Sequence, residues 1–67
     1  MKFKERFNEV LKTSAKTQTQ IARELNITKQ SVNDYKMGKS VPSIETLYLL
    51  CKILEVSADY LLGLTDY

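Results

Sequence analysis

The chain has 67 residues and a formal net charge of +2, with one cysteine and no histidine. A single cysteine excludes an internal disulfide, and without histidine we expect no metal site. There is no glycine-rich phosphate loop, and so short a chain offers no deep pocket, so we expect neither an enzyme nor a cofactor. Few glycines, one proline and abundant leucine, lysine and glutamate predict a single all-helical domain over residues 1–67.

The charge is unevenly distributed along the chain. Residues 12–39 carry six basic and two acidic side chains, whereas residues 40–67 carry one basic and four acidic ones. This split suits one surface that binds a polyanion and another that avoids it, although ordinary surface charge explains it equally well. The start, MKFKERFNEV, is charged throughout and has no signal-peptide core, and no apolar run is long enough to span a membrane. We therefore expect a cytoplasmic protein without a membrane partner or a small-molecule ligand.

The first 26 residues predict two helices. The first covers about residues 2–13 and ends in the polar run TSAKT. Thr17 caps the second helix, Gln20 completes a capping-box pattern, and Asn26 ends the helix because asparagine tolerates a left-handed backbone. Apolar residues at helical spacing are expected to face the core: Phe3, Phe7, Val10 and Leu11 in the first helix, and Ile21, Ala22 and Leu25 in the second.

A third helix, at about residues 28–37, follows a connection of only three residues, NIT. Thr28 caps this helix and Gly38 ends it. So short a connection makes the two helices cross steeply. That is the geometry of a helix-turn-helix, here at about residues 17–37.

The third helix is too polar to be stable alone. Val32 and Tyr35 are its only plainly apolar residues at helical spacing, and we expect Tyr35 to pack in the core rather than to stack on a ligand. Groups that read base edges in the DNA major groove occupy the rest of the helix, although a solvated surface has the same composition. These polar residues are Lys29, Gln30, Asn33, Asp34 and Lys36.

The last third of the chain predicts two more helices. Ser43 caps the fourth, which runs to about Leu54, and Ser57 caps a short fifth helix that Gly63 closes. Cys51 is interpreted as a small core residue rather than a reactive thiol. The expected core residues are Ile44, Leu47, Leu50, Cys51 and Leu54 in the fourth helix, and Leu61 and Leu62 in the fifth.

The segment TQTQIARELNITKQSVNDYKMGKSVPSIETLYLL closely resembles the helix-turn-helix of the phage-repressor/Cro-type (XRE) family, and the resemblance covers nearly the whole chain. Two departures are Asn26, which replaces the usual turn glycine, and Lys36, at a position often held by glutamate. The resemblance implies an all-α, compact five-helix bundle of the lambda-repressor-like DNA-binding type, with the helix-turn-helix formed by helices 2 and 3. The matching residues are Thr17, Gln18, Ile21, Ala22, Leu25, Ile27, Val32, Tyr35, Gly38, Lys39, Pro42, Ser43 and Leu47.

The same resemblance implies two sets of DNA contacts. The expected base-reading residues are Lys29, Gln30, Ser31, Asn33 and Asp34. The expected phosphate contacts are Thr17, Gln18, Lys36, Met37, Gly38, Lys39 and Ser40. We expect the last four to act partly through backbone N–H groups.

The fourth helix is apolar almost all round, which is typical of a helix that is central in the core or covered by a partner. The candidate dimer interface comprises Tyr48, Leu49, Ile53, Leu64 and Tyr67.

The expected function is a sequence-specific DNA-binding transcriptional regulator, with repression favoured over activation, that reads the major groove with the helix at about residues 28–37. We expect a homodimer on a double-stranded operator with two half-sites about 34 Å apart. The alternative is a protein-interaction module, an antitoxin or antirepressor partner that uses the fourth and fifth helices. The basic charge around the motif favours the first function.

Overall fold

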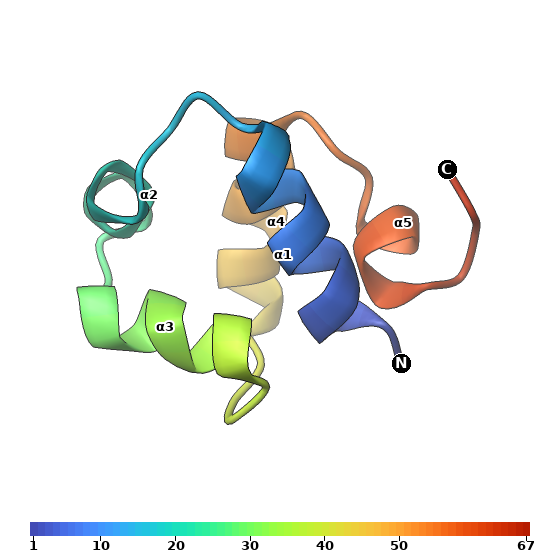
Figure 1. Ribbon diagram of the computed structural model, residues 1–67, viewed down its shortest axis with the longest axis horizontal. Helices are drawn as coiled ribbons and strands as arrows, with labels where there is room; N and C mark the ends of the chain where they lie inside the picture. The colour runs from blue at the N-terminus through green and yellow to red at the C-terminus, as the bar shows by residue number, and fades with distance from the viewer.

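A computed structural model describes residues 1–67 and contains five α-helices and no β-strand (Figure 1). The Cα radius of gyration is 10.6 Å, close to the value of about 11 Å for a folded domain of this length. The all-α, five-helix fold is therefore confirmed. None of these helices combines the length and the apolar character that crossing a membrane requires. The helices are α1 (Phe3–Thr13), α2 (Gln18–Leu25), α3 (Lys29–Met37), α4 (Ile44–Leu54) and α5 (Ala58–Leu62).

Four of the five helices begin at a hydroxyl side chain that accepts a hydrogen bond from a backbone N–H three residues on, at 3.0–3.1 Å. In α2 the capping box is complete, because the backbone N–H of Thr17 also donates to the side chain of Gln20 at 2.8 Å. Each such cap contributes about 1 kcal/mol to the free energy of unfolding. The capping residues are those predicted: Thr17, Thr28, Ser43 and Ser57.

Four helices end at a residue with a left-handed backbone. Asn26, Gly38 and Gly63 have φ values of 58°, 77° and 82°, as the sequence predicts. Glu55, with φ 56°, was not predicted to end α4 in this way. Val56 follows it, is packed against the core and donates its N–H to the Cys51 carbonyl at 3.1 Å. Tertiary packing therefore holds Glu55 in a conformation that its own side chain does not favour.

The helix-turn-helix has the steep crossing that its short connection predicts. In Figure 1, α2 is seen end-on while α3 lies across the view, so their axes are strongly inclined to each other. Both helices pack against the rest of the bundle, α3 on α1 and α2 on α4. As a result α3 runs along one edge of the molecule, which leaves one of its sides uncovered (Figure 1).

The core is built around an aromatic group from α1 and α3. The rings of Phe3 and Phe7 are stacked with centroids 5.3 Å apart, and Tyr35 meets both rings edge-on at 6.2 Å. Tyr35 is 8% exposed, which confirms this residue as part of the packing, and its burial raises its pKa. The buried apolar residues are Phe3, Phe7, Ile21, Ala22, Leu25, Val32, Tyr35, Leu50 and Leu61.

Arg6 is the one charged side chain buried in the core, and its role was missed in the sequence. Its guanidinium donates hydrogen bonds to the carbonyls of Tyr60 at 3.0 Å and Thr65 at 2.9 Å. The guanidinium also lies 4.3 Å from the centroid of the Tyr60 ring and 3.6 Å from the carboxylate of Asp66. Arg6 therefore ties α1 to the segment that follows α5.

Two expectations for α4 have different outcomes. Ile44 was expected in the core, but it is 88% exposed, so that expectation is wrong. Ile44 is the first residue of α4, and with Val41 and Pro42 it lines a shallow apolar hollow. Helical spacing gives the direction of a side chain but not what covers it. Cys51 does pack against the core, as predicted, and its partial burial raises the pKa of its thiol.

Candidate nucleic-acid interface

Only two residues of α3, Val32 and Tyr35, are buried in the core. Val32 is fully buried and Tyr35 is 8% exposed. On the other side of the helix, Lys29, Gln30 and Asn33 are exposed to solvent. The helix is therefore fastened along one narrow face and presents amide and ammonium groups on the other.

Gln30 and Asp34 are joined to each other one helical turn apart. The side-chain NH₂ of Gln30 donates to a carboxylate oxygen of Asp34 at 2.9 Å. A glutamine amide has two N–H donors and one carbonyl acceptor. Gln30 therefore keeps one N–H and its carbonyl oxygen free, which is the pair that recognises adenine N7 and N6. The bond to Asp34 restricts the amide before any ligand arrives.

Ser31 is the base-reading candidate that contacts the capping residue of α3. Its hydroxyl is 3.0 Å from the capping hydroxyl of Thr28, and its backbone N–H donates to the same oxygen at 3.0 Å. Ser31 is half-buried. It therefore combines a position at the edge of the exposed surface with a part in the cap of α3.

The start of α2 leaves backbone donors free. Thr17 and Gln20 satisfy each other through the capping box, but the N–H groups of Gln18 and Thr19 have no partner in the chain. Such unpaired donors, together with the helix dipole, favour an anion such as a phosphate.

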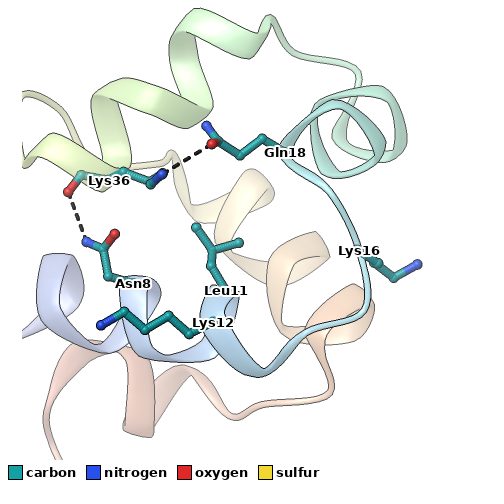
Figure 2. A pocket seen from close by; sticks show the side chains of 6 residues that line it. All are labelled: Asn8, Leu11, Lys12, Lys16, Gln18 and Lys36. Carbon is teal, nitrogen blue, oxygen red and sulfur yellow. Dashed lines mark hydrogen bonds between the residues drawn. The ribbon is translucent and has the colours of Figure 1, made fainter.

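A cleft of about 300 Å³ separates α1 from α2 and α3 beside this helix start (Figure 2). The ammonium of Lys36 donates to the side-chain oxygen of Gln18 at 3.2 Å across it. The Lys16 side chain points away from the cleft in Figure 2 and pairs instead with Glu24 at 2.9 Å. The lining residues are Asn8, Leu11, Lys12, Lys16, Gln18 and Lys36.

The turn after α3 uses most of its backbone donors internally. The N–H of Gly38 donates to the Tyr35 carbonyl at 3.3 Å, and the N–H of Lys39 donates to the Asp34 carbonyl at 2.9 Å. Ser40 keeps a free N–H, so it is the backbone donor that this turn has available. In the chain without DNA the helix cap thus uses the N–H groups of Gly38 and Lys39, and their contact with phosphate stays a prediction. The side chains of Met37, Lys39 and Ser40 are exposed.

One polar stripe of α1 was missed in the sequence. Lys4, Asn8 and Lys12 recur every four residues, which places them on one face of the helix. The stem of Lys4 lies against Gly38, and the side chain of Asn8 donates to the backbone carbonyls of Lys4 at 2.8 Å and Lys36 at 2.9 Å. The periodicity was a usable signal, but it does not tell which helix this face meets.

The candidate dimer residues differ in exposure. Ile53 is half-buried and contacts the core. The ammonium of Lys52 lies over the ring of Tyr48, 5.2 Å from the ring centroid. The exposed fractions of the other four candidates are 59% for Tyr48, 37% for Leu49, 72% for Leu64 and 91% for Tyr67.

Residues 9–61 match the helix-turn-helix family model. A cryptic phage CTXphi transcriptional repressor, RstR of Vibrio cholerae, is 40% identical over 63 residues, which is 94% of this chain and 56% of that protein. An uncharacterized HTH-type transcriptional regulator of Bacillus subtilis, YobD, is 34% identical over 62 residues, 92% of this chain and 55% of its own length. An SPbeta prophage-derived uncharacterized HTH-type transcriptional regulator of the same organism, YonR, is 38% identical over 60 residues, 90% of this chain and 56% of its own length.

The chain thus spans a little over half the length of the curated relatives that it matches. No solved structure gives a significant match.

Proposed function

The chain belongs to the helix-turn-helix family of the Cro/C1 (XRE) type, and from that membership we propose that it is a sequence-specific DNA-binding transcriptional regulator that reads the major groove with α3. The observation that carries the proposal is the arrangement of α3. Val32 and Tyr35 fasten it to the core, and its exposed side presents Lys29, Gln30 and Asn33. On an ordinary surface helix, such polar side chains would simply face the solvent. Here the free N–H groups at the start of α2 and a lysine-lined cleft adjoin the same helix at Lys36.

In this proposal the two sets of residues do different work. Base-edge contacts supply sequence discrimination, and contacts to phosphates supply most of the affinity and its dependence on salt. Lys29, Gln30 and Asn33 would contact bases directly, with Asp34 restricting Gln30 and Ser31 lying at the edge. The phosphate contacts would come from the start of α2 and from the end of α3 and its turn: Thr17, Gln18, Lys36, Met37, Gly38, Lys39 and Ser40.

We further propose that residues 1–67 act as one DNA-binding domain, that two copies bind one operator, and that binding represses transcription. Dimeric helix-turn-helix proteins bind half-sites about 34 Å apart, so that both recognition helices enter the same side of the duplex. The exposed apolar residues Tyr48, Leu49, Leu64 and Tyr67, with half-buried Ile53, are the surface proposed for self-association. Repression is supported by the relative that is a phage repressor. The mechanism needs no chemistry on the DNA, and the place of action is the bacterial cytoplasm.

Selection of binding sites from a random pool of DNA duplexes, with the purified protein, tests this function. The expected result is enrichment of one sequence with two-fold symmetry. A double variant, Gln30→Ala with Asn33→Ala, is the matched control, because both side chains are exposed and their loss leaves the core intact. We expect this variant to fold, as circular dichroism would show, and to enrich no sequence. A pool that the unmodified protein leaves unchanged would contradict the proposal.

A further inference from the structure

The hydrogen bond between Lys36 and Gln18 links the two helices of the motif at the edge of the cleft (Figure 2). We infer that Lys36 is a positioning residue, which turns the amide of Gln18 so that its NH₂ faces a DNA phosphate. This inference rests on the proposed function and assigns to Lys36 a task other than its own contact with phosphate.

The chemistry of the two side chains fixes the orientation of the amide. An ammonium group is a donor only, so the Gln18 atom 3.2 Å from the Lys36 nitrogen must be the carbonyl oxygen. Figure 2 shows that oxygen turned toward Lys36 and the nitrogen on the other side. The NH₂ group has no hydrogen-bond partner in the chain, and a phosphate oxygen is an acceptor. With Lys36 in place, Gln18 therefore presents two donors to the backbone of the DNA.

Lys36 is itself held in position. Asn8 donates to its backbone carbonyl at 2.9 Å, and the same Asn8 amide donates to the Lys4 carbonyl at 2.8 Å. Lys36 and Gln18 are both half-buried, so neither side chain has the full freedom of a surface residue. A donor that is oriented before binding loses less conformational entropy when the phosphate arrives.

No carboxylate of the chain pairs with the ammonium group of Lys36. The two ion pairs of the chain are Arg6 with Asp66 and Lys16 with Glu24. The one side-chain partner of Lys36 is the neutral amide of Gln18. Its positive charge thus remains to attract a phosphate, while the hydrogen bond orients the amide.

The sign of the charge at residue 36 therefore decides which end of the Gln18 amide faces outward. A carboxylate there would accept from the NH₂ and turn the carbonyl oxygen toward the phosphate, where two acceptors repel. Lys36→Arg keeps a donor and is expected to bind DNA like the unmodified protein. Lys36→Met is expected to bind more weakly, and Lys36→Glu more weakly still.

A double-mutant cycle on mixed-sequence duplex DNA separates this positioning from simple loss of charge, because contacts to phosphate do not depend on sequence. With Gln18 present, Lys36→Met is expected to raise Kd about tenfold, and in a Gln18→Ala background only about threefold, the effect of one lost charge. Lys12→Met is the matched control, since Lys12 lines the same cleft and has no hydrogen-bond or ion-pair partner in the chain. It is expected to raise Kd by the same factor in both backgrounds.

The side-chain amide signals of Gln18 in ¹⁵N-labelled free protein supply a readout that needs no DNA. Lys36→Met is expected to shift them and to leave those of Gln20, which is held in the capping box, unchanged. If Lys36→Met raises Kd equally in both backgrounds, or leaves the Gln18 signals in place, the positioning role is overturned while the proposed function stands. If the unmodified protein binds no duplex, the proposed function fails and this inference fails with it.

Discussion

At the scale of single residues, Gln30 is the clearest candidate for reading sequence. It is exposed, its amide is restricted by Asp34 at 2.9 Å, and one N–H and the carbonyl remain free. Gln30→Ala is therefore expected to weaken binding to the selected operator by about 1–3 kcal/mol, the value of one bidentate base contact, and to change binding to mixed-sequence DNA little. Fluorescence anisotropy with both duplexes at one salt concentration measures the difference.

Lys39→Ala is the control for Gln30→Ala. Lys39 is exposed in the turn after α3 and is proposed to contact phosphate, so its loss is expected to weaken binding to both duplexes equally. If Gln30→Ala also weakened both equally, Gln30 would be another backbone contact, and sequence discrimination would have to come from Lys29 or Asn33.

Arg6 is the residue on which the end of the chain depends. Arg6→Met keeps most of the apolar stem but leaves the carbonyl of Thr65 without its donor, while the carbonyl of Tyr60 keeps only the N–H of Gly63 at 3.1 Å. We expect it to lower the free energy of unfolding by about 2–4 kcal/mol. The nearby carboxylate of Asp66 is 96% exposed, so that ion pair adds little.

Urea unfolding followed by circular dichroism measures the effect of Arg6→Met. Arg23→Met is the comparison, because Arg23 is exposed and makes no side-chain hydrogen bond, and its loss is expected to change stability by no more than about 0.5 kcal/mol. A loss at Arg6 no larger than that at Arg23 would show that the buried guanidinium does not stabilise the fold.

At the scale of helices, the recognition helix depends on its cap, since few apolar contacts hold it. The hydroxyl of Thr28 accepts from the N–H of Ser31 at 3.0 Å. Thr28→Ala is expected to lower the free energy of unfolding by about 1 kcal/mol, which corresponds to a fall in Tm of roughly 4–8 °C for a domain of this size. Thr28→Ser keeps the hydroxyl and is expected to retain nearly all of the stability. Calorimetry of the unmodified protein and the two variants measures these Tm values. Equal Tm values for the alanine and serine variants would contradict the role of the cap.

Helix boundaries were predictable because their causes are local. A cap such as Thr17 or Thr28 and its backbone donor lie three residues apart, and Gly38 adopts its positive φ without steric cost. Glu55 was not predictable, because the packing of Val56 and not the glutamate side chain imposes its backbone. Ile44 was mispredicted for a similar reason, since its exposure depends on which other residues pack against the first turn of α4.

At the scale of the whole molecule, helical spacing predicted that Gln30 and Asn33 are exposed, but not that Asp34 is half-buried, and the partners of these residues could not be read from the sequence. Gln30 and Asp34 are four residues apart on one helix, so their contact is a local one. Lys36 and Gln18 are on different helices, and their contact depends on how α2 crosses α3. Periodicity defines the faces of each helix, whereas the pairing of faces is decided by the packing of all five.

Self-association also belongs to the whole molecule, and Leu49 gives a direct test of it. Leu49 is 37% exposed on α4, in a helix whose exposed side also carries Tyr48. Leu49→Lys puts an ammonium group where the proposed interface needs apolar contact, at little cost to the fold because the position reaches solvent. In analytical ultracentrifugation the unmodified protein is expected to sediment as a dimer and Leu49→Lys to shift toward monomer.

Met37→Lys is the control. It adds the same charge at a 56% exposed position on α3, outside the proposed interface, and is expected to leave the dimer intact. If Leu49→Lys left the mass unchanged as well, two copies on one operator would have to meet through another surface or through the DNA alone.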